Sequence, residues 1–293
     1  YDPKLKLARL KRVNSSVSGK NFEFIQMDLS EKNKLHDIFD SNFFEYVFHL
    51  AAQAGVGYSL INPVQYLESN IIGFFNLLES IRLKGKINHL IYASSSSVYG
   101  GCKETPFDEE LNVDKPLSFY AATKKSNELM AFTYSHIHKI PLTGVRLFTV
   151  YGPWGRPDMA LFKFVKSILN EEPLVVFNNG KMGRDFTYID DAVNALILLM
   201  EKPPRDEKLI KTSESLENPL YRVINIGNRK PVALMDFIAI IEKNLGRKAK
   251  INFSTLQPGD VQFTFANMQK FSNLTGFKFQ TPIEVGIKNF ISW

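Results

Sequence analysis

Short apolar runs alternate with longer amphipathic runs along the first half of the chain. The apolar runs predict strands, and the amphipathic runs predict helices. The predicted strands are 22–27, 45–50, 89–93 and 142–149, and the predicted helices are 32–40, 62–84 and 118–138. Polar and apolar positions alternate little within these strands, as is typical of strands buried on both faces. The order therefore predicts an α/β fold, with a parallel sheet covered by helices on both sides.

The second half of the chain is less regular. Glycine and proline recur from Gly152 to Gly183, which indicates turns and loops. Beyond them the pattern predicts helices at 189–200 and 233–245, strands at 221–226 and near Ile251, and helices near Asn267 and Pro282. The polar stretch 202–219 is expected to be a mobile loop. No repeat is visible, so a smaller unit of mixed α/β structure is expected here.

Composition excludes several classes of protein. Hydrophobic residues make up 44% of the chain and charged residues 23%, which rules out a disordered chain or a collagen. The single cysteine, Cys102, cannot form an internal disulfide, which favours a reducing, cytoplasmic setting. The apolar stretch 195–200 is much shorter than the about twenty residues that a membrane-spanning helix needs. No membrane association is expected.

Charge and histidine content limit the classes of ligand that are expected. The net charge of +6 comes from 36 basic and 30 acidic residues that are scattered along the chain. Nucleic-acid binders gather basic residues on one face, so no nucleic-acid partner is expected, whereas a small anionic ligand fits. The five histidines suggest no metal site, because His136 and His138 lie two positions apart on a predicted helix and face apart.

Two Tyr-x-x-x-Lys pairs occur, and their context separates them. Tyr99 and Lys103 flank two glycines, which indicates a turn. Tyr120 and Lys124 open a strongly helical segment, where positions i and i+4 share a face about 6 Å apart. A lysine cation at that range favours the phenolate and is expected to lower the pKa of Tyr120. Such a tyrosine could serve as a general base near neutral pH.

A run of four serines, Ser94–Ser97, follows the predicted strand 89–93. The carboxyl ends of parallel strands are where α/β proteins bind ligands. A polar turn is the other interpretation of such a run.

Together these residues resemble a known family. The chain is similar to the extended short-chain dehydrogenase/reductases, and within them to the nucleotide-sugar epimerases, closest to UDP-glucuronate 4-epimerases. The resemblance covers nearly the whole chain. It rests on the order and spacing of His49-Leu-Ala-Ala52, Asn70, Ser94-Ser-Ser-Ser-Val-Tyr-Gly100, Tyr120-x-x-x-Lys124, Arg146-Leu-Phe-Thr-Val-Tyr-Gly-Pro153, Arg184-Asp-Phe186 and Asn225-Ile-Gly-Asn228.

The resemblance implies NAD as the cofactor and a UDP-sugar as the substrate. It makes Tyr120 the base, Lys124 the residue that binds the nicotinamide ribose and tunes Tyr120, and Ser95 the hydroxyl that supports the substrate; Ser94 and Ser96 stay open as alternatives. The implied cofactor contacts are Asp28, Leu29, Leu50, Ala51, Ala52, Asn70, Ala93, Ser94, Tyr120 and Lys124. The implied substrate contacts are Ser95, Ser96, Thr149, Arg156, Met159, Ala160, Phe177, Arg184, Gln257 and Asp260. Two of these have other interpretations: Asp28 could cap the following helix, and Phe177 could be a core residue.

Four positions bear on the reaction. Relatives that dehydrate or decarboxylate nucleotide sugars commonly carry carboxyl groups where this chain has Ser96 and Ser97, and a hydroxyl cannot replace a carboxylate base. The resemblance makes Arg156 the partner of a sugar carboxylate, which a planar guanidinium suits, although a surface ion pair is the plainer alternative. Gly57 stands where that group usually has arginine. The expected reaction is 4-epimerisation of UDP-glucuronate to UDP-galacturonate, through a 4-keto intermediate.

Other functions stay open. A UDP-N-acetylglucosamine or UDP-glucose 4-epimerase is the first alternative, followed by a UDP-glucuronate decarboxylase or a sugar-nucleotide dehydratase, and then by an inactive nucleotide-binding scaffold. Intact Tyr120, Lys124 and Ser95 argue against the scaffold. A role in supplying surface polysaccharide is a guess from the family alone.

The resemblance also implies an organisation. It predicts a Rossmann-like, doubly wound NAD-binding domain at 1–150 plus about 186–228, and a nucleotide-sugar-binding domain at 151–185 plus 229–293. None of the 17 glycines forms the family's G-x-x-G-x-x-G loop, so the first βαβ unit is expected to precede this sequence. A homodimer is expected through a four-helix bundle of 63–84 and 118–138. Phe74, Leu77, Leu78 and Ile81 could form its buried stripe or face the sheet.

Overall fold

A computed structural model describes residues 1–16, 22–205, 219–256, 259 and 261–293. The helices are α1 (Pro3–Ser16), α2 (Lys32–Ser41), α3 (Val56–Ile61), α4 (Pro63–Tyr66), α5 (Gly73–Lys84), α6 (Phe119–His138), α7 (Ala160–Leu169), α8 (Ile189–Met200), α9 (Leu234–Leu245), α10 (Gln269–Thr275) and α11 (Ile283–Ser292). The strands are β1 (Tyr46–His49), β2 (His89–Ser95), β3 (Leu142–Leu147), β4 (Thr149–Tyr151), β5 (Leu174–Val176), β6 (Gly183–Tyr188), β7 (Tyr221–Ile226), β8 (Pro231–Ala233) and β9 (Ile251–Phe253).

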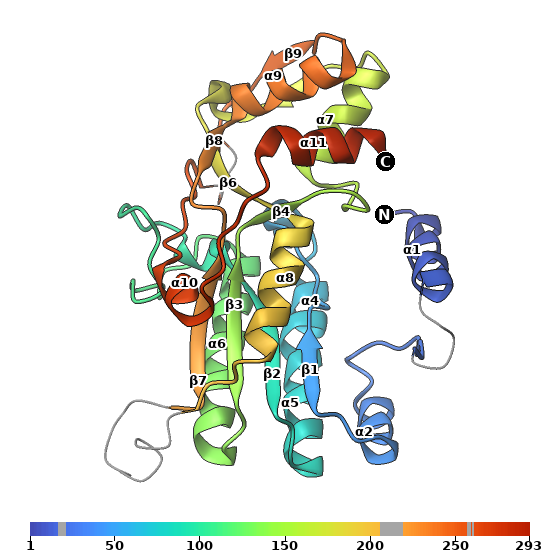
Figure 1. The fold of residues 1–293 in the computed structure, drawn as a ribbon, viewed down its shortest axis with the longest axis vertical. Helices are drawn as coiled ribbons and strands as arrows, with labels where there is room; N and C mark the ends of the chain where they lie inside the picture. Colours follow the sequence, from blue (N-terminus) through green and yellow to red (C-terminus); the bar gives the residue numbers. More distant parts are fainter. Residues whose placement is uncertain (17–21, 206–218, 257–258, 260) are drawn as a thin grey trace.

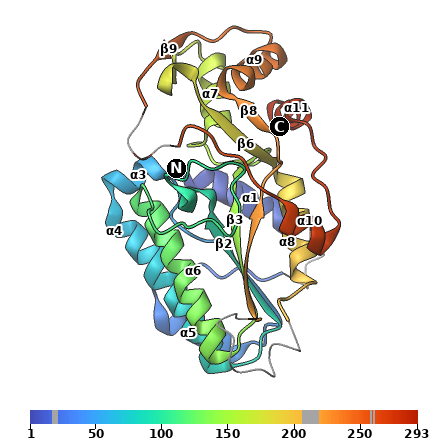
Figure 2. The ribbon, with the colours of Figure 1, turned by 90° about the vertical axis from the view of Figure 1, so that its left-hand side faces the viewer.

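The main sheet is parallel, in the order β1-β2-β3-β7, as the alternation of elements predicts. Helices α5 and α6 cover one face, and α8 and α10 cover the other (Figure 1, Figure 2). Successive side chains of β2 enter different cores: Leu90 and Tyr92 pack with α2, α5 and α6, whereas Ile91 packs with α8. Burial on both faces explains why these strands are apolar at consecutive positions.

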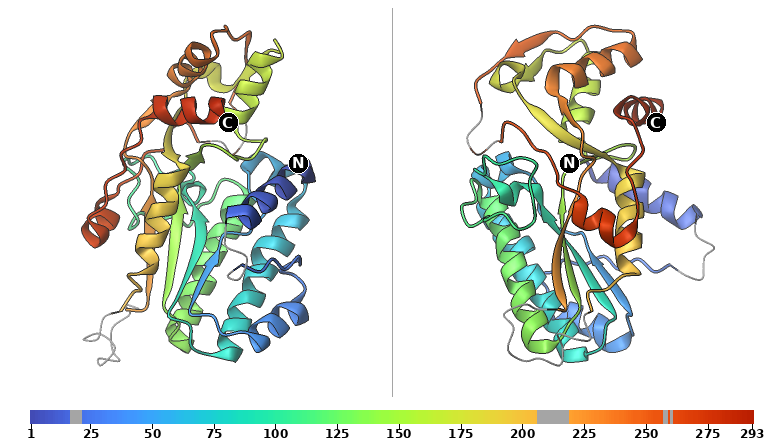
Figure 3. Two further views of the ribbon diagram at one scale, coloured as in Figure 1. Left: turned by 45° about the vertical axis from the view of Figure 1, so that its right-hand side comes forward. Right: turned by 60° about the vertical axis from the view of Figure 1, so that its left-hand side comes forward.

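A smaller unit lies beyond the carboxyl ends of the main strands, with α7, α9 and α11 gathered there (Figure 3). Its strands form a three-stranded sheet, β4-β6-β8, and a pair, β5-β9. Its core includes Val165 of α7, Phe186 of β6 and Phe237 of α9, and the last two rings stack with centroids 4.3 Å apart. The sheet therefore ends directly below a second core, and ligand space can form between them.

The packing differs in part from the predicted domain boundaries, which stay a prediction. Helix α8 and strand β7 pack with the main sheet. Within the range 229–293, however, Ala266, Met268 and Phe271 also enter the core of the main sheet. Phe271 contacts the rings of Phe277 and Phe279, so this aromatic group keeps α10 against the larger unit.

Several predicted elements are confirmed and some are wrong. Residues 22–27 form no strand, because no hydrogen-bonded neighbour pairs with them among the described residues. The predicted helix 62–84 is present, but a π-helical segment, Leu67–Ile72, interrupts it between α4 and α5. The predicted strand 142–149 divides into β3 and β4, and α1 and α7 were not predicted. Most of the predicted mobile loop 202–219 lies outside the described residues.

The turn at Tyr99–Lys103 is confirmed, and Gly100 shows why it needs glycine. Gly100 has φ of 46°, in the left-handed region, and a Cβ there would lie 2.9 Å from the backbone oxygen of Lys115. A side chain would therefore be strained and would also clash.

A buried ion pair joins α6 to the main sheet. Glu128 accepts from Nε and Nη2 of Arg146 on β3, at 2.9 Å each, and both side chains are buried. Ser94, at the end of β2, donates to the same carboxylate at 2.7 Å, and Arg146 lies across the ring of Tyr99, 4.8 Å from its centroid. Charges removed from water must be paired, so this contact fixes how α6 sits on β2 and β3.

Substitution of Glu128 by leucine is expected to lower the free energy of unfolding by about 3–5 kcal/mol, because it leaves the Arg146 charge buried and unpaired. The double variant Glu128→Leu/Arg146→Met should recover most of that loss. Urea denaturation followed by circular dichroism measures both. The exposed pair Glu110–Lys270 provides the control, since Glu110→Gln should cost less than about 1 kcal/mol. A double variant as unstable as the single one would contradict this account.

Candidate functional site

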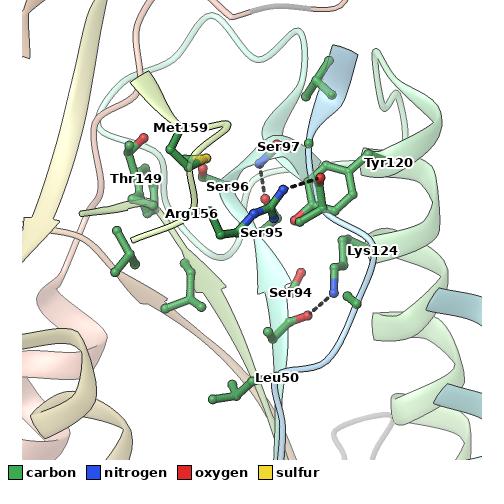
Figure 4. Close-up of a pocket in the computed structure, with 18 of the residues that line it drawn as sticks. Leu50, Ser94, Ser95, Ser96, Ser97, Tyr120, Lys124, Thr149, Arg156 and Met159 are labelled. Carbon is green, nitrogen blue, oxygen red and sulfur yellow. Dashed lines mark hydrogen bonds between the residues drawn. The ribbon is translucent and has the colours of Figure 1, made fainter. Parts of the chain in front are cut away.

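A cavity of about 900 Å³ opens at the carboxyl ends of β1, β2 and β3, beside the start of α6. It is lined by thirteen of the residues implied as site residues: Leu50, Ala51, Ala52, Ala93, Ser94, Ser95, Ser96, Tyr120, Lys124, Thr149, Arg156, Met159 and Arg184. Figure 4 shows the tyrosine, the lysine, the serines and Arg156 directed toward one another across this space. The structure therefore gathers residues that are distant in sequence into one site.

Helix α6 positions Tyr120 and Lys124. The helix begins after Ser118, whose hydroxyl accepts from the backbone N–H of Ala121 at 3.1 Å. Tyr120 and Lys124 follow on its first turns, one turn apart, so both point to the end of β2. The Lys124 ammonium donates to the backbone oxygen of Ala93 at 2.7 Å. This bond fixes the lysine at the floor of the cavity (Figure 4).

The pKa values of Tyr120 and Lys124 differ from the prediction. Burial raises the pKa of Tyr120, while a hydrogen bond with Ser95 and the charge of Arg156 act to lower it. The prediction that Lys124 lowers the pKa of Tyr120 is wrong for this structure, because desolvation dominates and Lys124 is not among the groups that lower it. Burial also lowers the pKa of Lys124 to about 8, which weakens the cation on which the prediction relied.

The serine run divides into separate roles. Ser94 is committed to Glu128 through its hydroxyl. Ser95 caps the short 3₁₀ helix Ser96–Tyr99, accepting from the backbone N–H of Ser97 at 3.2 Å, and it is the serine that interacts with the Tyr120 phenol. The geometry thus favours Ser95 over Ser94 as the partner of Tyr120, and Ser96 and Ser97 also line the cavity.

Arg156 enters the site from the loop between β4 and α7. Its guanidinium donates through Nε and Nη2 to the carboxylate of Asp158, and through Nη2 to the backbone oxygen of Ala54 at 3.2 Å. Trp154 in the same loop has φ of 61°, an uncommon value for a residue with a side chain. Arg9 of α1 donates to the backbone oxygens of Trp154 and Gly155, at 2.6 and 3.1 Å, and so holds this loop.

Some predicted cofactor contacts lie away from the cavity. Asn70 sits in the π-helical segment, where its amide bonds both the N–H and the C=O of Gln53 at 2.8 and 3.0 Å. It also donates to the Thr123 hydroxyl at 3.0 Å, so it clamps the loop after β1 onto α6. Asp28 accepts from the N–H and hydroxyl of Ser30, just before α2, and Leu29 packs beside Gly73. Their cofactor roles stay predictions.

The predicted nucleotide contacts are scattered in the same way. Arg184 lies in the cavity wall and donates to the backbone oxygens of Gly183 and Gln262. Ala160 lines a small adjoining hollow together with Met159. Phe177 is half-buried in the short helix Phe177–Gly180 and does not line the main cavity. Gln257 and Asp260 lie outside the described residues, although Gly259 and Val261 line the cavity.

Sequence reasoning missed several lining residues. Arg9, Val56, Leu117 and Val193 border the cavity from outside the predicted motifs, and Trp154 borders it from the loop that carries Arg156. Arg9 lies on α1, where no site residue was predicted. Gly57 is the second residue of α3, after Val56, and a Cβ there would meet no atom within 4 Å, so the position has open space around it.

The residues present fit the nicotinamide end of NAD. The floor of the cavity is built from Ala51, Ala52 and Ala93, whose small side chains leave space for a flat ring. The Lys124 ammonium, which uses one of its three N–H groups on Ala93, has donors left for ribose hydroxyls. No group of three or more His, Cys, Asp or Glu among the described residues is arranged to hold a metal ion. No helix in the described part of the chain is long and apolar enough to span a membrane.

Comparison with known proteins gives consistent matches. The profile of the NAD dependent epimerase/dehydratase family matches residues 3–227. Protein CapI of Staphylococcus aureus is 50% identical over 297 residues, covering 100% of this chain and 87% of that protein. A probable UDP-glucuronate 4-epimerase of Rhizobium meliloti is 47% identical over 253 residues, covering 85% of this chain and 74% of that protein. The crystal structure of the Bacillus cereus UDP-glucuronic acid 4-epimerase, in complex with UDP-glucuronic acid and NAD, superposes with a TM-score of 0.86 at 32% identity, covering 99% and 85% of the two chains.

The buried lysine predicts a pH dependence of stability. Burial lowers the pKa of Lys124 from 10.5 to about 8, so between these values the unfolded chain binds the proton and the folded chain does not. Stability therefore rises with pH across this window, and the cost of burying the charge, about 3 kcal/mol, is fully present below pH 8. Relative to Lys124→Met, wild type should gain that amount between pH 8 and 10.5, as measured by urea denaturation.

Lys124→Arg is the matched control for this measurement, because a guanidinium keeps its charge across the whole range. The arginine variant should show no comparable gain relative to Lys124→Met. A difference between wild type and Lys124→Met that is constant with pH would contradict the burial of a charged ammonium.

Proposed function

This chain belongs to the NAD dependent epimerase/dehydratase family, and we propose that it is an NAD-dependent 4-epimerase that interconverts UDP-glucuronate and UDP-galacturonate. The observation that carries the proposal is the convergence of Tyr120, Ser95 and Lys124 with Arg156 in one cavity. The first three residues suit removal of a hydroxyl proton, and the fourth suits a carboxylate.

The chemistry follows from the geometry. NAD, when bound, supplies the acceptor and donor of a hydride. Tyr120 takes the proton of the substrate 4-hydroxyl, while Ser95 hydrogen-bonds that oxygen and orients it. Lys124 holds the ribose side of the site and stays beside the phenol. The 4-keto sugar then turns over, and Tyr120 returns the proton once the opposite face has been reduced.

Arg156 supports the choice of a sugar acid. A guanidinium presents paired N–H groups that match the two oxygens of a carboxylate. The Rhizobium relative is named as a probable UDP-glucuronate 4-epimerase, and the Bacillus structure contains UDP-glucuronic acid. Arg184, in the wall of the cavity, is proposed to contact the diphosphate, with Thr149 and Met159 bordering the sugar and the uracil.

The alternatives are weaker. Decarboxylation or dehydration needs a carboxyl group near the sugar carbons next to C4, whereas the positions before Val98 are Ser96 and Ser97, which line the cavity as hydroxyls. A UDP-N-acetylglucosamine or UDP-glucose 4-epimerase would leave Arg156 without its anionic partner. An inactive scaffold would not need Tyr120 and Ser95 to be in contact.

Incubation with NAD and UDP-glucuronate is expected to yield an equilibrium mixture with UDP-galacturonate, resolved by proton NMR. Tyr120→Phe removes the proton acceptor and should reduce the rate by at least about a hundredfold. Tyr99→Phe is the matched control, because that tyrosine lies in a turn and bonds Asn225 instead. A pentose product would identify a decarboxylase and overturn the proposal, and turnover of only uncharged UDP-sugars would overturn the substrate.

We also propose a homodimer through α4, α5, α6 and the π-helical segment between α4 and α5. The stripe of Phe74, Leu77, Leu78 and Ile81 does not serve this role, since all four residues are buried against the sheet. The exposed apolar residues of these helices instead include Val64, Leu67, Ile72, Phe75 and Leu129. A reducing, cytoplasmic location also stays a prediction.

Leu129→Glu should convert the dimer to a monomer, because it places a charge in the apolar interface. Size-exclusion chromatography with light scattering measures the mass directly. Val285→Glu on α11, where the residue is also exposed but distant from these helices, should leave the dimer intact. A wild-type monomer, or a dimer that survives Leu129→Glu, would rule out this interface.

A further inference from the structure

The loop that carries Arg156 also carries Asp158, whose carboxylate competes with a substrate carboxylate for the Arg156 guanidinium. The backbone N–H of Met159 donates to the oxygen of Arg156 at 3.2 Å, which closes a turn with Pro157 and Asp158 at its centre. Proline at the first central position pre-sets the backbone of such a turn. The Asp158 carboxylate is thereby presented to the guanidinium two residues earlier.

The donors of Arg156 can be counted. Nε has one N–H, which goes to Asp158, and Nη2 has two, which go to Asp158 and to the Ala54 oxygen. The structure gives Nη1 no hydrogen bond within the described residues. A substrate carboxylate arriving at this arginine would find donors only on Nη1, and it could not form a paired contact while Asp158 stays in place.

The ion pair of Arg156 and Asp158 can open to let Arg156 bind another carboxylate. The side chains of Arg156 and Asp158 keep 33% and 45% of their surface exposed, unlike the buried pair of Arg146 and Glu128. Exposed ion pairs are screened by water and contribute little to stability. Partial burial acts to raise the pKa of Asp158, but the hydrogen bonds from Arg156 outweigh it and leave that pKa below its usual value. The competitor is therefore charged at neutral pH.

We propose that Asp158 is a specificity-determining residue, which occupies the guanidinium of Arg156 and gives it up to the carboxylate of an anionic sugar. The inference rests on the proposed function, because it assigns Arg156 to the sugar carboxylate. The sugar must leave Arg156 when the keto sugar turns over. Asp158 then forms the ion pair with Arg156 until the sugar carboxylate binds again. Asp158 weakens the hold on the sugar acid and has little effect on a neutral sugar.

The inference predicts a change in affinity with a definite sign. Asp158→Asn replaces the competing carboxylate by a neutral amide, so binding of UDP-glucuronate should tighten by at least about fivefold. Binding of UDP-glucose should change by less than about twofold, since it brings no carboxylate. Isothermal titration in the presence of NAD measures both ligands. Asp40→Asn, which breaks a surface ion pair with Lys84 on α2 and α5, is the matched control and should change neither.

A second measurement separates this role from a structural one. The charge of Arg156 acts to lower the pKa of Tyr120, and Asp158 partly neutralises that charge. With UDP-glucose as substrate, the acidic limb of the kcat/KM profile should therefore move to lower pH in Asp158→Asn. If Asp158 merely holds Arg156 in place, the limb would move to higher pH and UDP-glucuronate would bind more weakly, and the inference would be overturned.

Arg156→Met distinguishes failure of the inference from failure of the proposed function. Loss of the preference for UDP-glucuronate in this variant supports the assignment of Arg156, and the result with Asp158→Asn then decides the role of Asp158 alone. If Arg156→Met leaves the preference unchanged, the substrate assignment and the inference are both overturned.

Discussion

The buried contact between Glu128 and Arg146 is the constraint on which the site depends. It ties α6 to β3, and through Ser94 it also ties α6 to the end of β2. Lys124 lies one turn and Tyr120 two turns before Glu128 on the same face of this helix. Their distance from Ser95 and Ala93 is therefore set by a charge pair deeper in the protein, where a shift would expose an unpaired ion to apolar surroundings.

The cavity lies where two cores meet, and this explains its chemistry. The main sheet supplies a rigid floor of small residues and α6 supplies the Tyr120 phenol, whereas the loop after β4 supplies Arg156 from the other unit. Tyr66 packs edge-to-face on Tyr120, with ring centroids 6.0 Å apart, and bonds the oxygen of Gly55. One part of the site can thus be rigid and buried while the other stays exposed and exchangeable.

Much of this architecture could be predicted from the sequence, because a parallel sheet buried on both faces leaves continuous apolar runs such as Leu90–Ala93. Motif order also identified thirteen of the residues that line the cavity, among them Tyr120, Lys124, Ser95 and Arg156. Residues 22–27 were mispredicted because apolar composition cannot show whether a neighbouring strand exists. The pKa of Tyr120 was mispredicted because spacing on a helix gives proximity but not burial. Arg9 was missed because its contact with Trp154 spans a large sequence separation that no local pattern records.

The π-helical turn at Leu67–Ile72 lets this region absorb a change in chain length that a regular helix could not. Such a turn accommodates one residue more than an α-helix would. Loss of that residue would restore regular α geometry while the flanking turns keep their orientation, so Phe74 would stay in the core. It would, however, alter the turn that carries Asn70, whose amide bonds Gln53. Deletion of a residue from α5 itself would instead rotate one end of the helix against the other by about 100°.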